Sequence, residues 1–405
     1  MRLCITSEHR FDRTPDGSVW TSTNHSYADW SRYLSDFREV RILARVRDVA
    51  SPPDTGERAD GPDVSIWALP YYLGFGAFCK RWREVKRSAI AGIDPEDAVI
   101  LKAPSILSTL VEPALRRRGQ PFAVQVIGDP RDVYSAGAMR HPLRVVFREV
   151  LVRRTAALCR DASVVSYVTS ERLQALYPCR PLVFRNGVSD VVLSARSIVS
   201  RTRAKAAHTP LRLITVGSLE QLYKGTDTLL EAVHLCVRAG LDLRLVVVGG
   251  GQYQPMLEEL AKRLGIAGQI EFKGLLPAGD AVLAELDKCD LFVLPSRAEG
   301  LPRAMIEAMA RALPCIGSNA GGIPELLDQT CLVPPGEPRV LANKIIEVAS
   351  TPGMLSRMST ASLAKAKEFS ETTLAARRSE FLSQVADATL TRVRSLRNAV
   401  EEQPA

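Results

Sequence analysis

The stretch DLFVLPSRAEGLPRAMIEAMA (residues 290–310) predicts a strand, a short loop and a helix, in that order. Its first part is an apolar run that suits a buried strand, and its last part repeats apolar residues at helical spacing. Pro302 suits the first position of the helix, because proline lacks the N–H group that a helix start leaves unbonded. The free N–H groups and the positive dipole end of such a helix can bind a phosphate. The stretch therefore indicates an α/β domain with an anion site at the loop.

Two acidic residues stand in this stretch, Glu299 in the loop and Glu307 in the helix. A carboxylate can bind a diol, because each of its oxygens accepts one O–H donor. We expect Glu299 to lie beside a sugar and Glu307 to approach a ribose. The alternative is that both acids only cap and solvate the helix. The spacing of the two glutamates does not decide between these readings, but the order of strand, EGLP loop and helix favours a sugar site.

The second half of the chain alternates short apolar runs with amphipathic stretches. LRLITVG (211–217) and LRLVVVGGG (243–251) are predicted strands that end in glycine turns, and 226–240 and 255–265 have helical periodicity. Four more predicted strands are QIEFKG, DLFVLPS, PCIGSN and CLVPPG. Strands that alternate with helices predict a parallel sheet covered on both faces, which is a Rossmann-like domain.

The first half shows the same alternation less cleanly. Its predicted strands are RLCITS, VRILARV, DVSIWALP, AVILKAP, FAVQVIGD, SVVSYVT and LVFRNG, and its predicted helices are 26–39, 106–118 and 143–160. The polar stretch 202–210 is a candidate hinge. We therefore predict an α/β protein with two Rossmann-like domains whose parallel sheets face a central cleft. The N-terminal domain is 1–205, the C-terminal domain is 206–368, and a helical segment, 369–405, returns to the N-terminal domain.

The turns that end the predicted strands should face one site, because ligands of such sheets bind beyond the carboxyl ends of the strands. In the second half these turns fall at Gly217, Gly249, Gly274 and Ser296. The run GGG at 249–251 also suggests a dinucleotide site. It lacks the G-x-G-x-x-G spacing, and no acidic residue ends a strand about 20 positions later, so NAD binding is not expected. A packing turn that faces the cleft is the favoured interpretation.

Several segments together resemble a known family. Glu299, Gly300, Leu301, Pro302 and the helix through Ala310 resemble the donor-site signature of family-4 glycosyltransferases of the GT-B fold. VGSLEQLYKGTDTLLEA and VVVGGGQYQPMLEELAKRLG resemble the first two βα units of the family's C-terminal domain, and FRNGV, IEFKGLLP and SNAGGIPELL resemble its other turns. The resemblance spans roughly residues 184–381.

The resemblance implies a retaining hexosyltransferase that uses a UDP- or GDP-sugar, with no metal and no other cofactor. It implies that Glu299 binds hydroxyls of the transferred sugar, Glu307 holds the ribose, and Lys224 neutralises the diphosphate. The family usually has arginine where this chain has Ser218, so either Lys224 carries more of the charge or Arg303 compensates. The other implied donor-site residues are Gly217, Gly225, Gly249, Lys273, Gly274, Gly300, Leu301 and Pro302.

The N-terminal domain is expected to bind the acceptor. RTPDGSVW (13–20) is predicted to be a flexible loop that reaches toward the diphosphate. Asp129 ends a predicted strand at the cleft, where many relatives have histidine; it could orient the acceptor hydroxyl or cap the next segment. His9 and His141 are further candidates for the cleft, and a structural role is favoured for each.

Positive charge is concentrated in the first half of the chain. Residues 1–208 contain 32 Lys and Arg against 22 Asp and Glu. The segment GFGAFCKRWREVKR (74–87) places Phe75, Phe78, Trp82 and Val85 at helical spacing among basic residues, which is typical of a helix on an anionic membrane. The alternative is an ordinary basic helix with its apolar face in the core. We expect a glycan or lipid-linked acceptor from bacterial surface glycan synthesis, and an anionic membrane surface is a candidate partner.

Sequence features restrict the location and the alternative functions. The chain has no apolar run of about 18 residues and no signal-peptide pattern, and its eight cysteines form no CxxC pair, so we expect a cytoplasmic protein that touches the membrane only peripherally. A GT-B nucleotide-sugar epimerase and a non-catalytic partner subunit remain alternatives. Nucleic-acid binding through the basic half is not expected, and it would show steep salt dependence.

Overall fold

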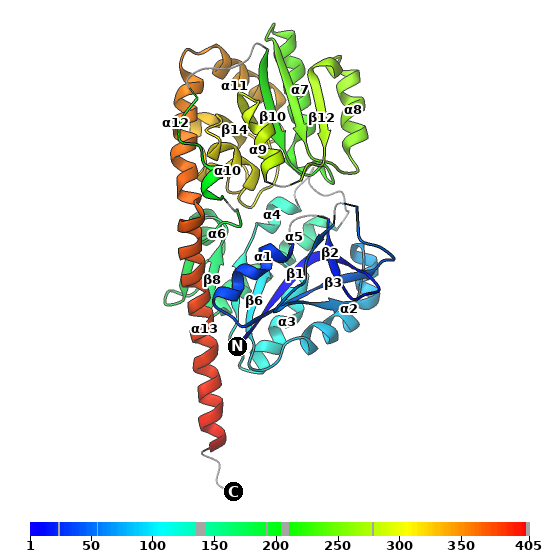
Figure 1. Cartoon of the computed structure of the whole chain (residues 1–405), viewed down its shortest axis with the longest axis vertical. Coiled ribbons are helices and arrows are strands. Elements are labelled where there is room, and N and C mark those ends of the chain that lie inside the picture. Colours follow the sequence, from blue (N-terminus) through cyan, green and yellow to red (C-terminus); the bar gives the residue numbers. More distant parts are fainter. Residues whose placement is uncertain are drawn as a thin grey trace.

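A computed structural model describes residues 1–22, 25–54, 56–134, 143–191, 193–203, 210–277 and 279–401. It shows two α/β domains, one above the other in Figure 1, each built on one mainly parallel sheet with helices on both faces. This confirms the predicted fold class. The predicted boundary at 205/206 falls in 204–209, outside the described residues, and stays a prediction.

The N-terminal sheet has seven parallel strands in the order β5-β3-β1-β6-β7-β8-β9. All seven predicted strands of this half are present. They are β1 (Arg2–Arg13), β3 (Glu39–Asp48), β5 (Val64–Leu69), β6 (Ala98–Ala103), β7 (Ala123–Val126), β8 (Val164–Tyr167) and β9 (Phe184–Gly187). Its helices are α1 (Tyr27–Ser31), η1 (Arg32–Ser35), α2 (Gly74–Ala91), α3 (Ile106–Arg117), α4 (Pro130–Val133), α5 (Arg144–Asp161), α6 (Arg172–Leu176) and η2 (Ala195–Ser197).

The predicted flexible loop at 13–20 is wrong, because this segment is the turn of a hairpin. Strand β1 continues to Arg13 and pairs antiparallel with β2 (Val19–Thr21), which in turn pairs with β4 (Glu57–Arg58). The Asp16 carboxylate closes the turn by accepting hydrogen bonds from Ser18 N at 3.1 Å and Ser18 Oγ at 2.7 Å. Such a side-chain turn holds the loop in one shape.

The C-terminal sheet has six parallel strands in the order β12-β11-β10-β13-β14-β15. The strands are β10 (Leu211–Val216), β11 (Leu243–Val248), β12 (Ile270–Gly274), β13 (Leu291–Leu294), β14 (Cys315–Ser318) and β15 (Leu332–Val333), as the sequence predicts. The helices are η3 (Leu222–Lys224), α7 (Thr226–Arg238), α8 (Gln254–Arg263), η4 (Ala267–Gln269), α9 (Asp280–Asp287), α10 (Arg303–Ala310), η5 (Ile323–Glu325), η6 (Gln329–Cys331), α11 (Pro338–Ser350), α12 (Met354–Ala366) and η7 (Lys367–Phe369).

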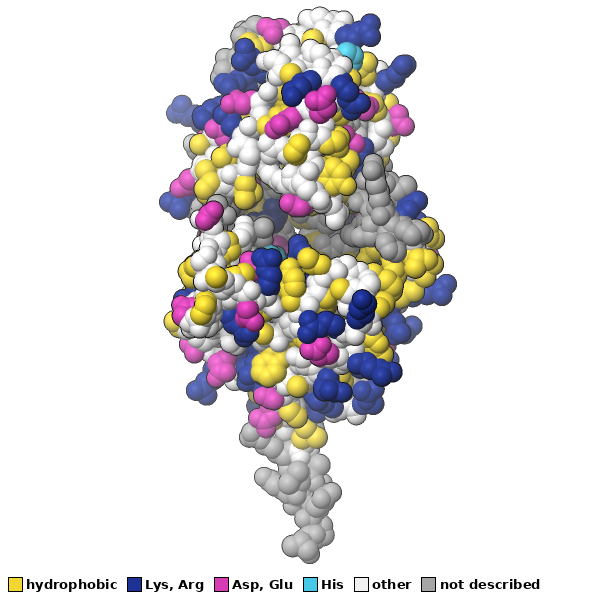
Figure 2. All heavy atoms as spheres, turned by 90° about the vertical axis from the view of Figure 1, so that its right-hand side faces the viewer, with side chains coloured by type: hydrophobic (Ala, Val, Ile, Leu, Met, Phe, Trp, Pro, Cys, Tyr) yellow, Lys and Arg dark blue, Asp and Glu magenta, His cyan; other side chains and the backbone are white. Residues whose placement is uncertain are grey.

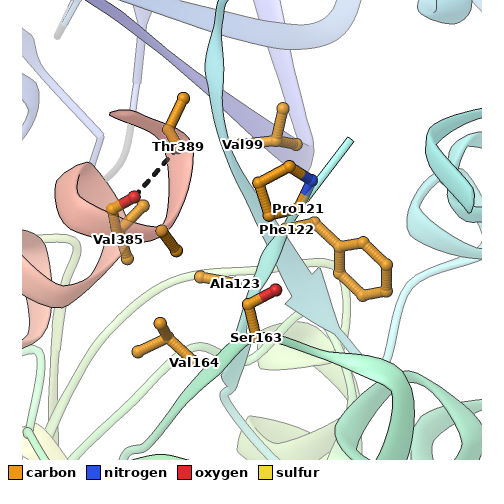
Figure 3. Close-up of a pocket in the computed structure, with 9 residues that line it drawn as sticks. Val99, Pro121, Phe122, Ala123, Ser163, Val164, Val385 and Thr389 are labelled. Carbon is orange, nitrogen blue, oxygen red and sulfur yellow. Dashed lines mark hydrogen bonds between the residues drawn. The ribbon is translucent and has the colours of Figure 1, made fainter. Parts of the chain in front are cut away.

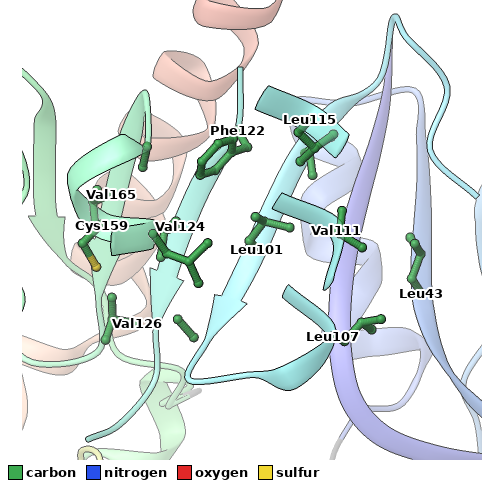
Figure 4. Packing of buried hydrophobic residues seen from close by; sticks show 14 of the residues in the cluster. Leu43, Leu101, Leu107, Val111, Leu115, Phe122, Val124, Val126, Cys159 and Val165 are labelled. Carbon is green, nitrogen blue, oxygen red and sulfur yellow. The ribbon is translucent and has the colours of Figure 1, made fainter. Parts of the chain in front are cut away.

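Both sheets are buried on both faces, as their nearly continuous apolar strands require. On one face of the N-terminal sheet, side chains of β6 and β7 such as Leu101 and Val124 pack against Val111 and Leu115 of α3 (Figure 4). On the opposite face, Ile5 and Ile100 belong to a second apolar cluster. Layers of this kind leave the loops at the carboxyl ends of the strands as the places where polar chemistry can gather.

The C-terminal helix α13 (Glu371–Glu401) leaves the C-terminal domain and runs along the N-terminal domain (Figure 1). It contacts β6, β8 and β9, and its residues Phe381, Leu382 and Val385 are buried in the N-terminal core. Where α13 meets this sheet, Val385 and Thr389 line a crevice with Val99 and Val164 that has no room for a water molecule (Figure 3). The helix therefore ties the two domains together by close packing.

Candidate active site

The strand order reverses at one point in each sheet, and parallel α/β sheets bind their ligands at these points. In the C-terminal sheet the reversal lies between β10 and β13. The loop after β10 carries Lys224, and the loop after β13 carries Glu299. In the N-terminal sheet the reversal lies between β1 and β6, and in Figure 2 the surface is hollowed between the two domains.

Lys224 and Glu299 form a direct ion pair. Lys224 Nζ donates to Glu299 Oε1 at 2.7 Å, and Ser296 Oγ donates to the same oxygen at 2.7 Å. Only 16% of the Lys224 side chain and 6% of the Glu299 side chain are exposed. Burial acts to lower the pKa of Lys224, but the Glu299 carboxylate and the Tyr223 ring outweigh it, so the pKa lies above its ordinary value. The lysine is therefore a cation fixed beside a carboxylate.

Glycines allow the turns beneath this pair to come close together. The Gly217 N–H donates to Val248 O at 2.9 Å, and the Gly249 N–H donates to Gly274 O at 2.8 Å. Gly249 has a φ of 133°, and a Cβ there would lie 1.9 Å from Gly217 O. Gly225, with a φ of 71°, would meet Pro295 O at 2.1 Å. The three predicted turns after β10, β11 and β12 thus lie together at one edge.

The loop of Glu299 is supported by the glycine turn that follows β14. The Gly322 N–H donates to Gly300 O at 2.7 Å. A Cβ on Gly321 would lie 2.0 Å from Glu299 O, so only glycine allows this approach. Helix α10 begins at Arg303, directly after Pro302, which is the N-cap residue and ends the loop. The arrangement gives Glu299 a fixed backbone.

Glu307 lies in α10, on the C-terminal side of this loop, and is half-buried. Burial raises the pKa of its carboxyl above the ordinary value, and Arg303 lowers it in part. Among the described residues, no hydrogen bond or ion pair holds this carboxylate. A partly buried acid of this kind is suited to accept hydroxyl donors from a ligand.

Two of the predicted donor-site side chains have local partners. Ser218 Oγ accepts from Glu220 N at 3.2 Å. Lys273, on the edge strand β12, pairs with Glu271 at 2.6 Å and lies 3.8 Å from Glu285. The structure does not bring Lys273 to the ion pair of Lys224 and Glu299.

Arg297 is a residue of the site that the sequence does not reveal. Its guanidinium bonds both carboxylate oxygens of Asp227 at 2.8 Å and also donates to Leu222 O at 2.7 Å. These bonds join the loop of Lys224 to the loop of Glu299. The only signal in the sequence is the charge of Arg297 beside the motif, because its partner Asp227 is 70 residues away.

The N-terminal domain contacts the Glu299 loop directly. A Cβ on Gly300 would lie 2.4 Å from Ile127 O, at the end of β7, and 3.6 Å from Val168. Across the same boundary, Glu325 accepts hydrogen bonds from the backbone N–H groups of Ser170 at 2.6 Å, Glu171 at 3.2 Å and Arg172 at 2.7 Å. A carboxylate of one domain therefore caps helix α6 of the other.

Asp129 lies at the end of β7 and caps α4. Its Oδ1 accepts from Arg131 N at 2.9 Å and from the Tyr177 hydroxyl. The capping alternative is therefore realised, and the orientation of an acceptor hydroxyl stays a prediction. Asp132, one turn further on, was not singled out in the sequence; burial, Asp129 and Glu299 raise its pKa to about 6, and one of its oxygens is buried without a hydrogen bond.

The two histidines predicted as candidates for the cleft are His9 and His141. His9 is stacked on His25 with ring centroids 4.6 Å apart, and its Nε2 lies 2.8 Å from Thr21 Oγ1. Burial and then the nearby His25, Arg10 and Lys102 lower the pKa of His9 to about 3, which indicates a neutral structural ring. His141 lies outside the described residues.

Lys102 is another residue whose position the sequence does not reveal. It is the last residue but one of β6, at the reversal point of the N-terminal sheet, and only 8% of it is exposed. Its ammonium lies 5.1 Å from the centroid of the Trp30 ring. In the described part of the chain no carboxylate pairs with it. A cation in this position is suited to meet a polar or anionic group of an acceptor.

Two further properties concern only the described residues. No helix among them is long and apolar enough to cross a bilayer. No group of three or more His, Cys, Asp and Glu side chains among them could hold a metal ion.

Two facing Rossmann-like domains, with a lysine–glutamate pair at the reversal point of the second sheet, define a protein of the GT-B class. Residues 210–351 match the family model of group 1 glycosyl transferases. Protein CapJ of Staphylococcus aureus is 26% identical over 339 residues, which cover 83% of this chain and 83% of CapJ. The putative colanic acid biosynthesis glycosyltransferase WcaL of Escherichia coli K12 is 33% identical over 172 residues, which cover 40% of each protein.

Solved structures agree with this fold over nearly the whole chain. Sucrose-phosphate synthase from Thermosynechococcus elongatus superposes with a TM-score of 0.72 at 17% identity, covering 96% of this chain and 100% of that one. Anabaena HepE in complex with UDP-glucose superposes with a TM-score of 0.64 at 16% identity, covering 95% and 99%. Residues 210–351 are thus similar to the group 1 glycosyltransferases, and the chain as a whole has the GT-B fold.

Proposed function

We propose that this glycosyltransferase moves a hexose-like unit from a UDP- or GDP-sugar to an acceptor hydroxyl and retains the anomeric configuration. The observation that carries the proposal is the buried pair of Lys224 and Glu299 at the reversal point of the C-terminal sheet. A cation and a carboxylate fixed 2.7 Å apart suit a ligand that is anionic at one end and rich in hydroxyls at the other.

The donor would lie along the loops that carry these residues. Glu299 would accept hydroxyls of the sugar, the backbone amides of Gly300 to Pro302 would bind the sugar and the diphosphate, and Lys224 would neutralise the phosphate charge. Glu307 is half-buried and has no hydrogen-bond or ion-pair partner among the described residues, and it would accept the ribose hydroxyls. HepE, which shares the fold, is described in complex with UDP-glucose, and this favours a uridine donor as the first to test.

The residues of this chain would promote the reaction by electrostatics. Negative charge grows on the diphosphate as the bond to the sugar breaks, and Lys224 and the amides would stabilise this charge. The departing phosphate oxygen would take the proton of the acceptor hydroxyl on the same face. The contacts of Gly300 with Ile127 and of Glu325 with α6 would keep water out of the closed site. Metal plays no part in this scheme.

We propose a bacterial surface polysaccharide or a lipid-linked glycan precursor as the acceptor, with the reaction at the cytoplasmic face of the membrane. WcaL is named for colanic acid biosynthesis, which supports a polysaccharide acceptor. Lys102 and Asp132 would line the N-terminal wall that such an acceptor enters, and Asp129 accepts a hydrogen bond from the backbone N–H of Arg131 in that wall.

The test is a comparison of sugar nucleotides with the purified full-length chain. Incubation with UDP-, GDP- or ADP-sugars and an acceptor extract should release nucleoside diphosphate, and NMR of the product should show the donor's anomeric configuration. Lys224→Ala or Glu299→Gln should lower kcat by about 100-fold to 1,000-fold while the chain stays folded. An inverted product would refute the retaining reaction, and a donor isomer formed without acceptor would favour the epimerase alternative.

A further inference from the structure

Helices α2 and α5 expose large apolar side chains that no element of the described chain covers. The exposed fractions are 42% for Phe75 and 39% for Trp82 in α2, and 55% for Val146 and 51% for Val150 in α5. Leu73 and Val145 beside them are also exposed. We call these six residues the docking face. Monomeric proteins rarely gather exposed apolar side chains in one place unless the place binds something.

The docking face differs from the stripe that the sequence predicts in 74–87. Val85 of that stripe is buried in the core and Phe78 is half-buried, so only Phe75 and Trp82 remain outside. Helix α5 supplies the rest. The rings of Phe75 and Phe147 lie 4.6 Å apart and join the first turns of α2 and α5 into one surface.

Exposed basic side chains continue from the docking face along both helices. Lys80, Arg83 and Arg87 follow one another at helical spacing on α2, and Arg153 and Arg154 come one turn after Val150 on α5. In the described part of the chain none of these five forms an ion pair. Figure 2 shows hydrophobic side chains gathered at one edge of the N-terminal domain, just below the hollow, and Lys and Arg side chains spread over the face beneath.

We propose that the docking face seats the enzyme on an anionic lipid bilayer. Apolar side chains at the tips of two helices would enter the boundary between headgroups and acyl chains, and the five basic side chains would lie over the anionic headgroups. A second copy of this chain is a poorer occupant, because two such faces would bring their cations together.

The position of the docking face connects it to the proposed reaction, on which this part of the inference rests. Helix α5 packs against α4, and α4 begins at Pro130, three residues after the Ile127 carbonyl that meets the Glu299 loop. A membrane at the first turn of α5 would therefore lie close to the N-terminal wall of the site. A lipid-linked acceptor could reach the site while its chain stays in the bilayer.

Vesicle binding tests the docking face. Full-length protein is sedimented with phosphatidylcholine vesicles that contain or lack phosphatidylglycerol, at low and high salt. We expect binding only to vesicles with phosphatidylglycerol, weakened by salt. Val146→Ser with Val150→Ser should weaken it about tenfold or more through lost apolar burial. Arg83→Gln with Arg87→Gln should weaken it about thirtyfold. The control is Val340→Ser, which changes an exposed valine (40%) on α11 and should bind as the wild type does.

Each result decides the proposal. Equal binding to both vesicle types, or wild-type binding by the Val146/Val150 variant, would overturn it. The proposal would also be overturned if the protein did not bind vesicles but formed a dimer in solution that the same substitutions dissociate. The docking face would then bind a second copy of the chain. The thermal shift produced by UDP or GDP is measured on the wild type and on every variant. If neither nucleotide shifts the melting temperature of the wild type, the proposed donor is refuted, and the vesicle result still stands on its own.

Discussion

Arg297 connects the loops of Lys224 and Glu299, so its guanidinium governs how the two side chains meet. It holds Asp227 through two bonds of 2.8 Å, and both residues are about one-fifth exposed. Asp227 is the first acid of α7, three residues after Lys224. A bidentate pair of this kind fixes direction as well as distance.

We expect Arg297→Ala to lower kcat/KM for the donor by about 10-fold to 100-fold, since a hydrogen bond to a charged group contributes about 1.5–3 kcal/mol. Arg297→Lys should recover only part of this, because lysine cannot bind both oxygens in the same plane. Asp227→Ala combined with Arg297→Ala should cost less than the sum of the two single changes. Additive effects, or an equal effect of the exposed control Arg339→Ala, would show that the pair does not position the site.

Asp132 gives the site a dependence on pH. Burial, then Asp129, and to a smaller degree Glu299 raise its pKa from 3.8 to about 6, while Arg172 and Arg131 oppose the rise. An acid whose folded pKa is raised stabilises the fold in its protonated form. Its contribution is complete below about pH 4 and is lost as the pH rises through 6.

The measurement is urea unfolding of the wild type and Asp132→Asn between these pH values. The wild type should lose more unfolding free energy from pH 4 to pH 6 than the variant loses, because the amide does not ionise. Parallel curves for the two proteins would contradict the raised pKa of Asp132.

At the scale of elements, the glycine turns after β10, β11 and β12 set the shape of the donor side. Gly249 shows this most clearly, because its φ of 133° and its contact with Gly217 O both exclude a side chain. Gly249→Ala should lower the Tm by several degrees and weaken donor binding, since strained backbone costs about 1–3 kcal/mol. The matched control is Gly268→Ala in η4, where a Cβ meets nothing within 4 Å. Equal melting temperatures for the two variants would contradict this account.

The elements also show which features the sequence can reveal. Strands such as LRLVVVGGG were predictable because an uninterrupted apolar run and a glycine turn are both local signals. The hairpin of β1 and β2 was not, since Asp16 closes its turn within a polar segment that reads equally well as a loop. The donor-site pair followed from family resemblance, whereas Arg297 and Glu325 depend on partners 70 and more than 150 residues away. Such long-range contacts leave no local pattern.

At the scale of the whole molecule, helix α13 and Glu325 both hold the domains in their present relation. Helix α13 packs on the N-terminal sheet, and Glu325 of the C-terminal domain caps α6 of the N-terminal domain. The packing of α13 is apolar and extensive, whereas the Glu325 contact consists of three hydrogen bonds at a partly exposed edge. We infer that the Glu325 contact is the one that breaks when the cleft opens.

Glu325→Ala should therefore increase the radius of gyration measured by small-angle scattering and raise the KM for the donor, because more molecules have an open cleft. The Tm should change little, since both domain cores stay intact. The control Glu337→Gln, an exposed glutamate at the start of α11, should leave scattering and KM unchanged. Unchanged scattering by Glu325→Ala would rule out this role for the contact.

The central claim is that the loops after β10 and β13 and the first turns of α10 form a nucleotide-sugar site. Its most direct test is calorimetric titration of UDP and GDP into the wild type and Glu307→Ala. We predict that one of the two nucleotides binds the wild type with one site per chain, and that the variant binds about 10-fold to 100-fold more weakly, because the ribose loses a carboxylate acceptor. Absence of binding by either nucleotide, or equal binding by wild type and variant, would contradict the account.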